Sequence, residues 1–139
     1  MLFLALTAAL SWGIGLPLAT WPPHREAIGM AIFFTACLMP VWAYAVFRRE
    51  GTEIDPISET NRALVTGGPY RFSRNPMYLG LVVAALGVAI WAGWPLMLAA
   101  PIAAFFTAQF VHIPFEEAKM RRQFGAAYDA YVARVRRWL

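Results

Sequence analysis

Long apolar runs alternate with polar segments along this chain. The runs cover about residues 2–20, 27–47, 77–91 and 96–115, and they contain very few charged side chains. A helix rises about 1.5 Å per residue, so a run of roughly 20 residues crosses the ~30 Å hydrocarbon core of a bilayer. The pattern therefore predicts an all-α integral membrane protein with about four transmembrane helices.

The last segment, residues 116–139, has a different pattern. Its apolar and aromatic side chains recur every three to four residues, and most of its basic side chains lie off that stripe. The stripe consists of Met120, Phe124, Tyr128, Tyr131, Val135 and Trp138. This spacing predicts one amphipathic cytoplasmic helix, lying in the membrane interface or docked on the bundle. Pro114, just before it, predicts a break or kink after the fourth span.

A polar segment rich in turn-forming residues, 48–76, separates the second run from the third. A loop this long in a small domain is usually functional. At its end, Asn75 and Pro76 suit the N-cap and the first position of a helix. The third span would then present free amides and the positive end of its dipole, which favours an anion, with Arg71 and Arg74 nearby. The alternative is an ordinary capped helix whose arginines contact lipid headgroups.

Composition and charge support a membrane setting. Hydrophobic residues make up 60% of the 139 residues and charged residues 14%, whereas soluble domains have about 25% charged residues. The formal net charge is +4, and arginines flank the apolar runs, which favours membrane lipids over nucleic acid as partners. Basic residues concentrate in the central loop and the tail. The chain is therefore expected to be a single multi-pass domain, 1–139, with a retained first span and both termini in the cytoplasm.

Candidate chemistry is sparse. One cysteine, Cys37, and two distant histidines, His24 and His112, provide no metal-ligand set, so no metal is expected. Glu116 and Glu117 lie side by side at the end of the fourth run. Two carboxylates beside a bilayer are unfavourable unless they are hydrated or partnered. They either begin the tail helix or hydrogen-bond a polar ligand.

Two blocks of sequence resemble a known superfamily. The first is GGPYRFSRNPMYLG and the second is EEAKMRRQFGAAYDAYVARVRRW, with one helical hairpin between them. They are similar to motifs of the isoprenylcysteine carboxyl methyltransferase and phospholipid methyltransferase superfamily, which consists of integral membrane enzymes that use S-adenosylmethionine. The resemblance covers about residues 64–138. It implies methyl transfer from S-adenosylmethionine to a lipophilic acceptor dissolved in the membrane.

The resemblance also implies a set of cofactor contacts at the cytoplasmic face. They are Arg62, Ala63, Leu64, Val65, Tyr70, Asn75, Pro76, Met77, Tyr78, Glu116 and Glu117. Asn75 replaces a histidine found in many relatives. His112 replaces an arginine that holds the substrate carboxylate in the isoprenylcysteine enzymes, and a neutral histidine cannot clamp a carboxylate in that way. His112 is therefore either a catalytic base towards an amine or thiol, or a structural residue.

The sequence leaves the chemical group that accepts the methyl undetermined. A phospholipid amine or a small thiol is the alternative to a carboxyl group, and a non-catalytic small membrane protein is the alternative to an enzyme. The motifs set neither the reactive group of the acceptor nor the oligomeric state.

Overall fold

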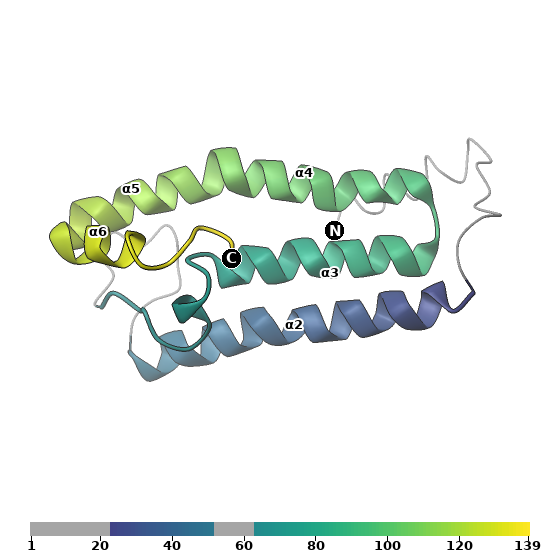
Figure 1. Cartoon of the computed structure of the whole chain (residues 1–139), viewed down its shortest axis with the longest axis horizontal. Helices are drawn as coiled ribbons and strands as arrows, with labels where there is room; N and C mark the ends of the chain where they lie inside the picture. Colours follow the sequence, from purple (N-terminus) through teal and green to yellow (C-terminus); the bar gives the residue numbers. More distant parts are fainter. Residues whose placement is uncertain (1–22, 52–62) are drawn as a thin grey trace.

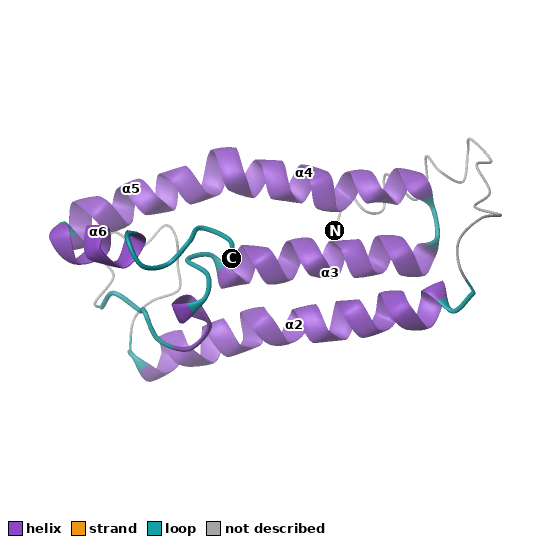
Figure 2. Ribbon diagram, in the orientation of Figure 1, coloured by secondary structure: helices purple, strands orange, loops and turns teal. Residues whose placement is uncertain are grey.

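The computed structural model describes residues 23–51 and 63–139, and these parts are helical without a strand (Figure 2). The predicted first span, residues 2–20, and part of the central loop lie outside them. The longer helices are α2 (Arg25–Arg49), α3 (Pro76–Ala92), α4 (Ala99–Thr107), α5 (Ile113–Phe124) and α6 (Ala126–Val132). Two 3₁₀ turns, η1 (Gly68–Arg71) and η2 (Pro95–Leu98), and a π-helical segment, η3 (Ala108–His112), complete the chain order.

Three long rods lie side by side, with α3 between α2 and the rod that contains α4 and α5 (Figure 1). That rod is continuous over Pro95–Phe124, 30 residues, and it and the 25-residue α2 are long and apolar enough to cross a membrane. The 17-residue α3 is shorter. Large apolar side chains point outward, as at Leu38 and Phe110, which are 66% and 67% exposed. An apolar outer surface suits a lipid environment, and the predicted membrane character agrees with it.

Small residues let α2 and α3 approach closely. A Cβ atom on Gly87 would lie 2.7 Å from the Phe33 nitrogen and 2.8 Å from the Gly29 oxygen, both backbone atoms that cannot move aside. Buried Ala36 and Ala43 continue the small-residue face along α2. Between helices in a membrane, such faces bring backbones together and strengthen van der Waals packing.

Replacing Gly87 with alanine is therefore expected to destabilise the bundle by about 1–3 kcal/mol, the usual cost of overpacking. Gly67→Ala is the matched control, because a Cβ there meets nothing within 4 Å and the backbone has φ −88°. Thermal unfolding in detergent measures both variants. Equal melting temperatures would show that α2 and α3 do not approach as closely as described.

The prediction of one tail helix over residues 116–139 is wrong. The helix ends at Phe124, and Gly125 turns the chain with φ 50° and ψ −126°, a conformation that strains any residue with a Cβ. The short α6 follows and ends at Val132. Residues 133–139 then run back towards the bundle without forming a helix, and we call them the C-terminal strap.

Of the break or kink expected at Pro114, no break occurs, because the rod continues through this residue. Proline lacks an amide hydrogen, and its ring clashes with the carbonyl one turn earlier. The π-helical η3 ends at His112, two residues before Pro114, and widens that turn. The local change in winding accommodates the proline without ending the helix.

The C-terminal strap is fastened to two parts of the bundle. The Asn75 side chain donates a hydrogen bond to the carbonyl oxygen of Arg137 at 3.0 Å. The Trp138 indole donates to the side-chain oxygen of Gln109 at 2.8 Å. The strap therefore joins the start of α3 to the π-helical turn in the long rod.

Candidate functional site

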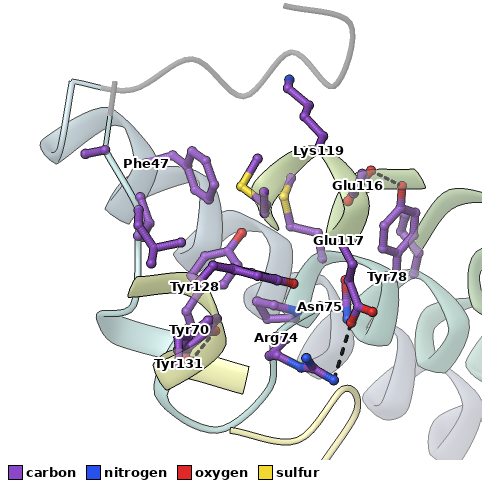
Figure 3. Close-up of a pocket in the computed structure, with 17 residues that line it drawn as sticks. Phe47, Tyr70, Arg74, Asn75, Tyr78, Glu116, Glu117, Lys119, Tyr128 and Tyr131 are labelled. Atoms are coloured by element: carbon purple, nitrogen blue, oxygen red, sulfur yellow. Dashed lines mark hydrogen bonds and ion pairs between the residues drawn. The ribbon is translucent and has the colours of Figure 1, made fainter. Parts of the chain in front are cut away.

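A pocket of about 330 Å³ opens where α2 ends, α3 begins and α5 turns into α6 (Figure 3). This volume is within the range of about 300–1,000 Å³ for small-molecule sites. The lining residues are Phe47, Ala63, Leu64, Val65, Tyr70, Arg74, Asn75, Pro76, Met77, Tyr78, Leu81, Glu116, Glu117, Lys119, Met120, Tyr128 and Tyr131.

Every cofactor contact expected from the motifs lines this pocket, except Arg62, which lies outside the described residues. The two sequence blocks thus meet at one place. The cofactor contacts expected from the motifs do not include Phe47, Arg74, Leu81, Lys119, Met120, Tyr128 and Tyr131. Three of these belong to the tail stripe, whose period shows that a face is apolar but not which surface it covers.

Tyr78 and Glu116 form a polar pair on one wall of the pocket. The Tyr78 hydroxyl donates to Oε1 of Glu116 at 2.6 Å, a short contact typical of a charged acceptor. The ring of His112, one turn before Glu116, stacks on the Tyr78 ring with centroids 5.9 Å apart and planes 11° apart. His112 is exposed on the outside of the rod and does not line the pocket. Its contact with the pocket is therefore indirect, through the ring of Tyr78.

Glu117 is engaged by two arginines. Its side chain is only 9% exposed, and Oε2 accepts from Nη2 of Arg137 at 2.6 Å. Oε1 accepts from Nε of Arg137 at 3.2 Å and lies 3.3 Å from Nη2 of Arg74. Both carboxylate oxygens are therefore occupied, and this side chain joins α5 to the loop before α3 and to the strap.

The start of α3 differs from the sequence expectation in one respect. The helix begins at Pro76, as expected, but the Asn75 side chain makes no capping hydrogen bond. That side chain donates to the strap, and the Asn75 backbone amide donates to Ser73 Oγ at 3.1 Å. The first-turn residues Met77 and Tyr78, both in the pocket lining, thus belong to a helix end that no side chain in the described ranges caps.

Tyr70, Tyr128 and Tyr131 form the wall of the pocket opposite Tyr78 and Glu116. The Tyr131 hydroxyl donates to the Tyr70 carbonyl oxygen at 2.7 Å, and the Tyr70 ring meets the Phe47 ring edge-on at 5.3 Å. Burial raises the pKa of Tyr131, and the neighbouring Tyr128 raises it further. Burial also raises the pKa of Tyr70. Both hydroxyls are therefore protonated at neutral pH, so the Tyr131 hydroxyl can donate to the Tyr70 carbonyl oxygen.

Outward-facing apolar helices, with a pocket that is rich in charged and aromatic side chains at one end of the bundle, define a helical membrane protein. The phospholipid methyltransferase family model matches residues 24–127. The chain belongs to that family, and the match confirms the superfamily resemblance expected from the two motif blocks.

Individual relatives agree with the family match over part of the chain. Phosphatidylethanolamine N-methyltransferase B of Dictyostelium discoideum is 38% identical over 45% of this chain and 32% of its own length. A probable protein-S-isoprenylcysteine O-methyltransferase of Oryza sativa subsp. indica is 32% identical over 55% of this chain and 40% of its own. The Delta(14)-sterol reductase TM7SF2 of Mus musculus is 26% identical over 81% and 31%.

The chain thus spans less than half the length of these relatives. No solved structure matches it significantly.

Proposed function

We propose that this protein transfers a methyl group from S-adenosylmethionine to a lipophilic acceptor dissolved in the membrane. One observation carries the proposal: the motif residues from both sequence blocks line a single pocket at one end of an apolar bundle. Membership of the phospholipid methyltransferase family supports it.

The residues of the pocket suit such a cofactor. One oxygen of Glu116 is held by Tyr78, which orients the carboxylate to accept from a ribose hydroxyl or an ammonium group. Met77 and Met120 provide soft apolar surface for an adenine ring. The cofactor supplies an already activated methyl group, so the protein has to orient two reactants and exclude water.

The outer wall of the pocket explains how a lipophilic acceptor would arrive. Leu81 lines the pocket and is nevertheless 58% exposed on the apolar outside of α3. Phe115 on the long rod is 62% exposed. The pocket wall is therefore continuous with surface that faces hydrocarbon, and an acceptor can approach sideways from the bilayer.

We favour a phospholipid amine over a carboxyl group as the acceptor. His112 stands where the isoprenylcysteine enzymes carry an arginine, and it has no fork of donors to hold a carboxylate. The family model that matches is that of phospholipid methyltransferases.

The direct test is cofactor binding followed by product identification. Purified protein in detergent is titrated with S-adenosylmethionine by calorimetry, and labelled methyl transfer into a total lipid extract is followed by mass spectrometry of the product. A labelled phosphatidylethanolamine derivative is expected. Absence of binding would contradict the proposal, and binding of a nicotinamide hydride donor instead would indicate a reductase like the sterol relative.

His112→Arg tests the choice of acceptor. The variant is expected to bind the cofactor normally, because His112 lies outside the pocket lining. It is expected to lose activity on the native amine, because a fixed positive charge beside Tyr78 repels an ammonium group. The ratio of turnover on amine and carboxyl acceptors measures the effect. Full native activity would show that His112 does not influence the choice.

The proposed topology places the pocket in the cytoplasm. In a Cys37→Ala background, a cysteine at exposed Thr66, near the pocket, is expected to react with an impermeant reagent only after cells are opened. A cysteine at exposed Glu26, at the opposite end of α2, is expected to react in intact cells. The reverse pattern would invert the orientation.

A further inference from the structure

Arg74 is a buried arginine with donors that the described protein does not use. Its side chain is only 11% exposed, and Nη2 faces Glu117 at 3.3 Å. Its Nε and Nη1 atoms are buried and have no hydrogen-bond partner in the described ranges. Buried donors nearly always have a partner, so a lining residue with two unused ones indicates a ligand group that accepts hydrogen bonds.

The charges around Arg74 are also unbalanced. Glu117 is shared by two guanidinium groups, and Arg137 makes the shorter contacts with it, at 2.6 and 3.2 Å. One carboxylate thus faces two positive charges. A buried charge that is only partly compensated is unfavourable, and an anion that binds beside Arg74 would relieve it.

The start of α3 adds a second attraction for an anion at the same pocket. This 17-residue helix has no side-chain cap among the described residues, and its first-turn residues Met77 and Tyr78 line the pocket beside Arg74. Uncapped amides and the positive end of the helix dipole favour an anion. Glu116 points into another part of the pocket, towards Tyr78, so it does not occupy this position (Figure 3).

We propose that Arg74 and the first turn of α3 bind the anionic group of the ligand, while Glu117 and Arg137 fix the orientation of the guanidinium. Glu117 is then a positioning residue and Arg74 the ligand contact. The identity of the ligand rests on the proposed function. The anion is the carboxylate of the methyl donor or the phosphate of a phospholipid acceptor. The first is a planar oxyanion and the second a tetrahedral one, and a guanidinium group can donate two parallel hydrogen bonds to either.

Arg74→Met is the informative variant. It removes the guanidinium but leaves Glu117 paired with Arg137, so no buried carboxylate loses all its partners. Arg71→Met is the matched control, because Arg71 is exposed on the same loop and outside the pocket lining. If Arg74→Met does not fold, Arg74→Lys replaces it, since lysine keeps the charge but loses the fork.

Two ligands that differ in the anionic group distinguish the sources. S-Adenosylhomocysteine has a carboxylate, whereas methylthioadenosine lacks the whole amino-acid portion. If the anion is the donor carboxylate, Arg74→Met weakens S-adenosylhomocysteine binding about ten- to hundredfold and leaves methylthioadenosine binding unchanged. If the anion is the lipid phosphate, both affinities stay unchanged and KM for the phospholipid rises by a similar factor. Arg71→Met changes none of these values.

A third measurement separates this inference from the proposed function. Inorganic phosphate is expected to raise the melting temperature of the wild-type protein above that in chloride of equal ionic strength, and Arg74→Met is expected to lose the increase. This measurement decides on the anion site even if no adenosyl compound binds, a result that would contradict only the methyltransferase proposal. Equal behaviour of wild type and Arg74→Met in all these measurements overturns the inference.

Discussion

Replacing Glu117 with alanine is expected to destabilise the folded protein by about 3–5 kcal/mol, the cost of removing one partner from a buried ion pair. The carboxylate is 9% exposed and lies between Arg74 and Arg137. Its loss leaves the two guanidinium groups, 11% and 30% exposed, without their shared carboxylate, and the strap loses its ion pair with α5. Denaturation of the purified protein, followed by circular dichroism, measures the change.

Asp129→Ala is the control for this prediction. Asp129 pairs with Arg121 at 3.1 Å, but the two side chains are 61% and 50% exposed, and exposed pairs contribute only about 0–1 kcal/mol. Adding Arg137→Met to a Glu117→Met variant is expected to recover part of the lost stability, because an apolar pair leaves fewer unpaired charges. If Glu117→Ala is as stable as Asp129→Ala, the ion pair is not buried as described.

Glu116→Ala, one residue earlier, is expected to leave the fold intact and to weaken S-adenosylmethionine binding by about 1.5–3 kcal/mol, or roughly ten- to hundredfold. Glu116 faces the pocket, so its loss removes a charged acceptor from the ligand, together with the one hydrogen bond that Tyr78 on α3 donates to it. Calorimetry measures the affinity, and circular dichroism verifies folding.

Tyr78→Phe provides the companion variant. It removes the hydroxyl that orients Glu116 and keeps the ring that stacks on His112. The expected loss is smaller, and the double variant should show coupling because the two side chains are in direct contact. Additive effects would indicate that Tyr78 does not orient the carboxylate. Unchanged affinity in Glu116→Ala would remove this residue from the proposed site.

Hydropathy alone predicted the main helices well. The runs 27–47 and 77–91 correspond to α2, Arg25–Arg49, and α3, Pro76–Ala92. Helix ends that face a bilayer are set by where the apolar sequence stops, and this is visible in the chain. The motif blocks likewise identified most of the pocket lining, because the resemblance carries spatial information that composition and periodicity do not.

Where the structure differs from the sequence predictions, contacts between distant parts of the chain are the reason. The Asn75 side chain was expected to cap α3. Its amide instead donates a hydrogen bond to the carbonyl oxygen of Arg137 in the strap, a residue far away in the sequence. The tail stripe continues across Gly125 in sequence, although the glycine permits a reversal that a periodic pattern cannot show. The paired acids could not be told apart either, since only the fold brings Arg74 and Arg137 to Glu117.

The C-terminal strap determines when the site can form during synthesis. The hydrogen bonds that fasten the strap to the start of α3 join residues 62 and 64 positions apart, Asn75 and Ser73 to Arg137. A chain leaves the ribosome from its N-terminus, so the apolar helices enter the membrane before these partners exist. Glu117, which lines the pocket, can pair with Arg137 only after the strap has emerged. A nascent chain stalled before the strap would therefore hold its helices in the bilayer without a finished binding site.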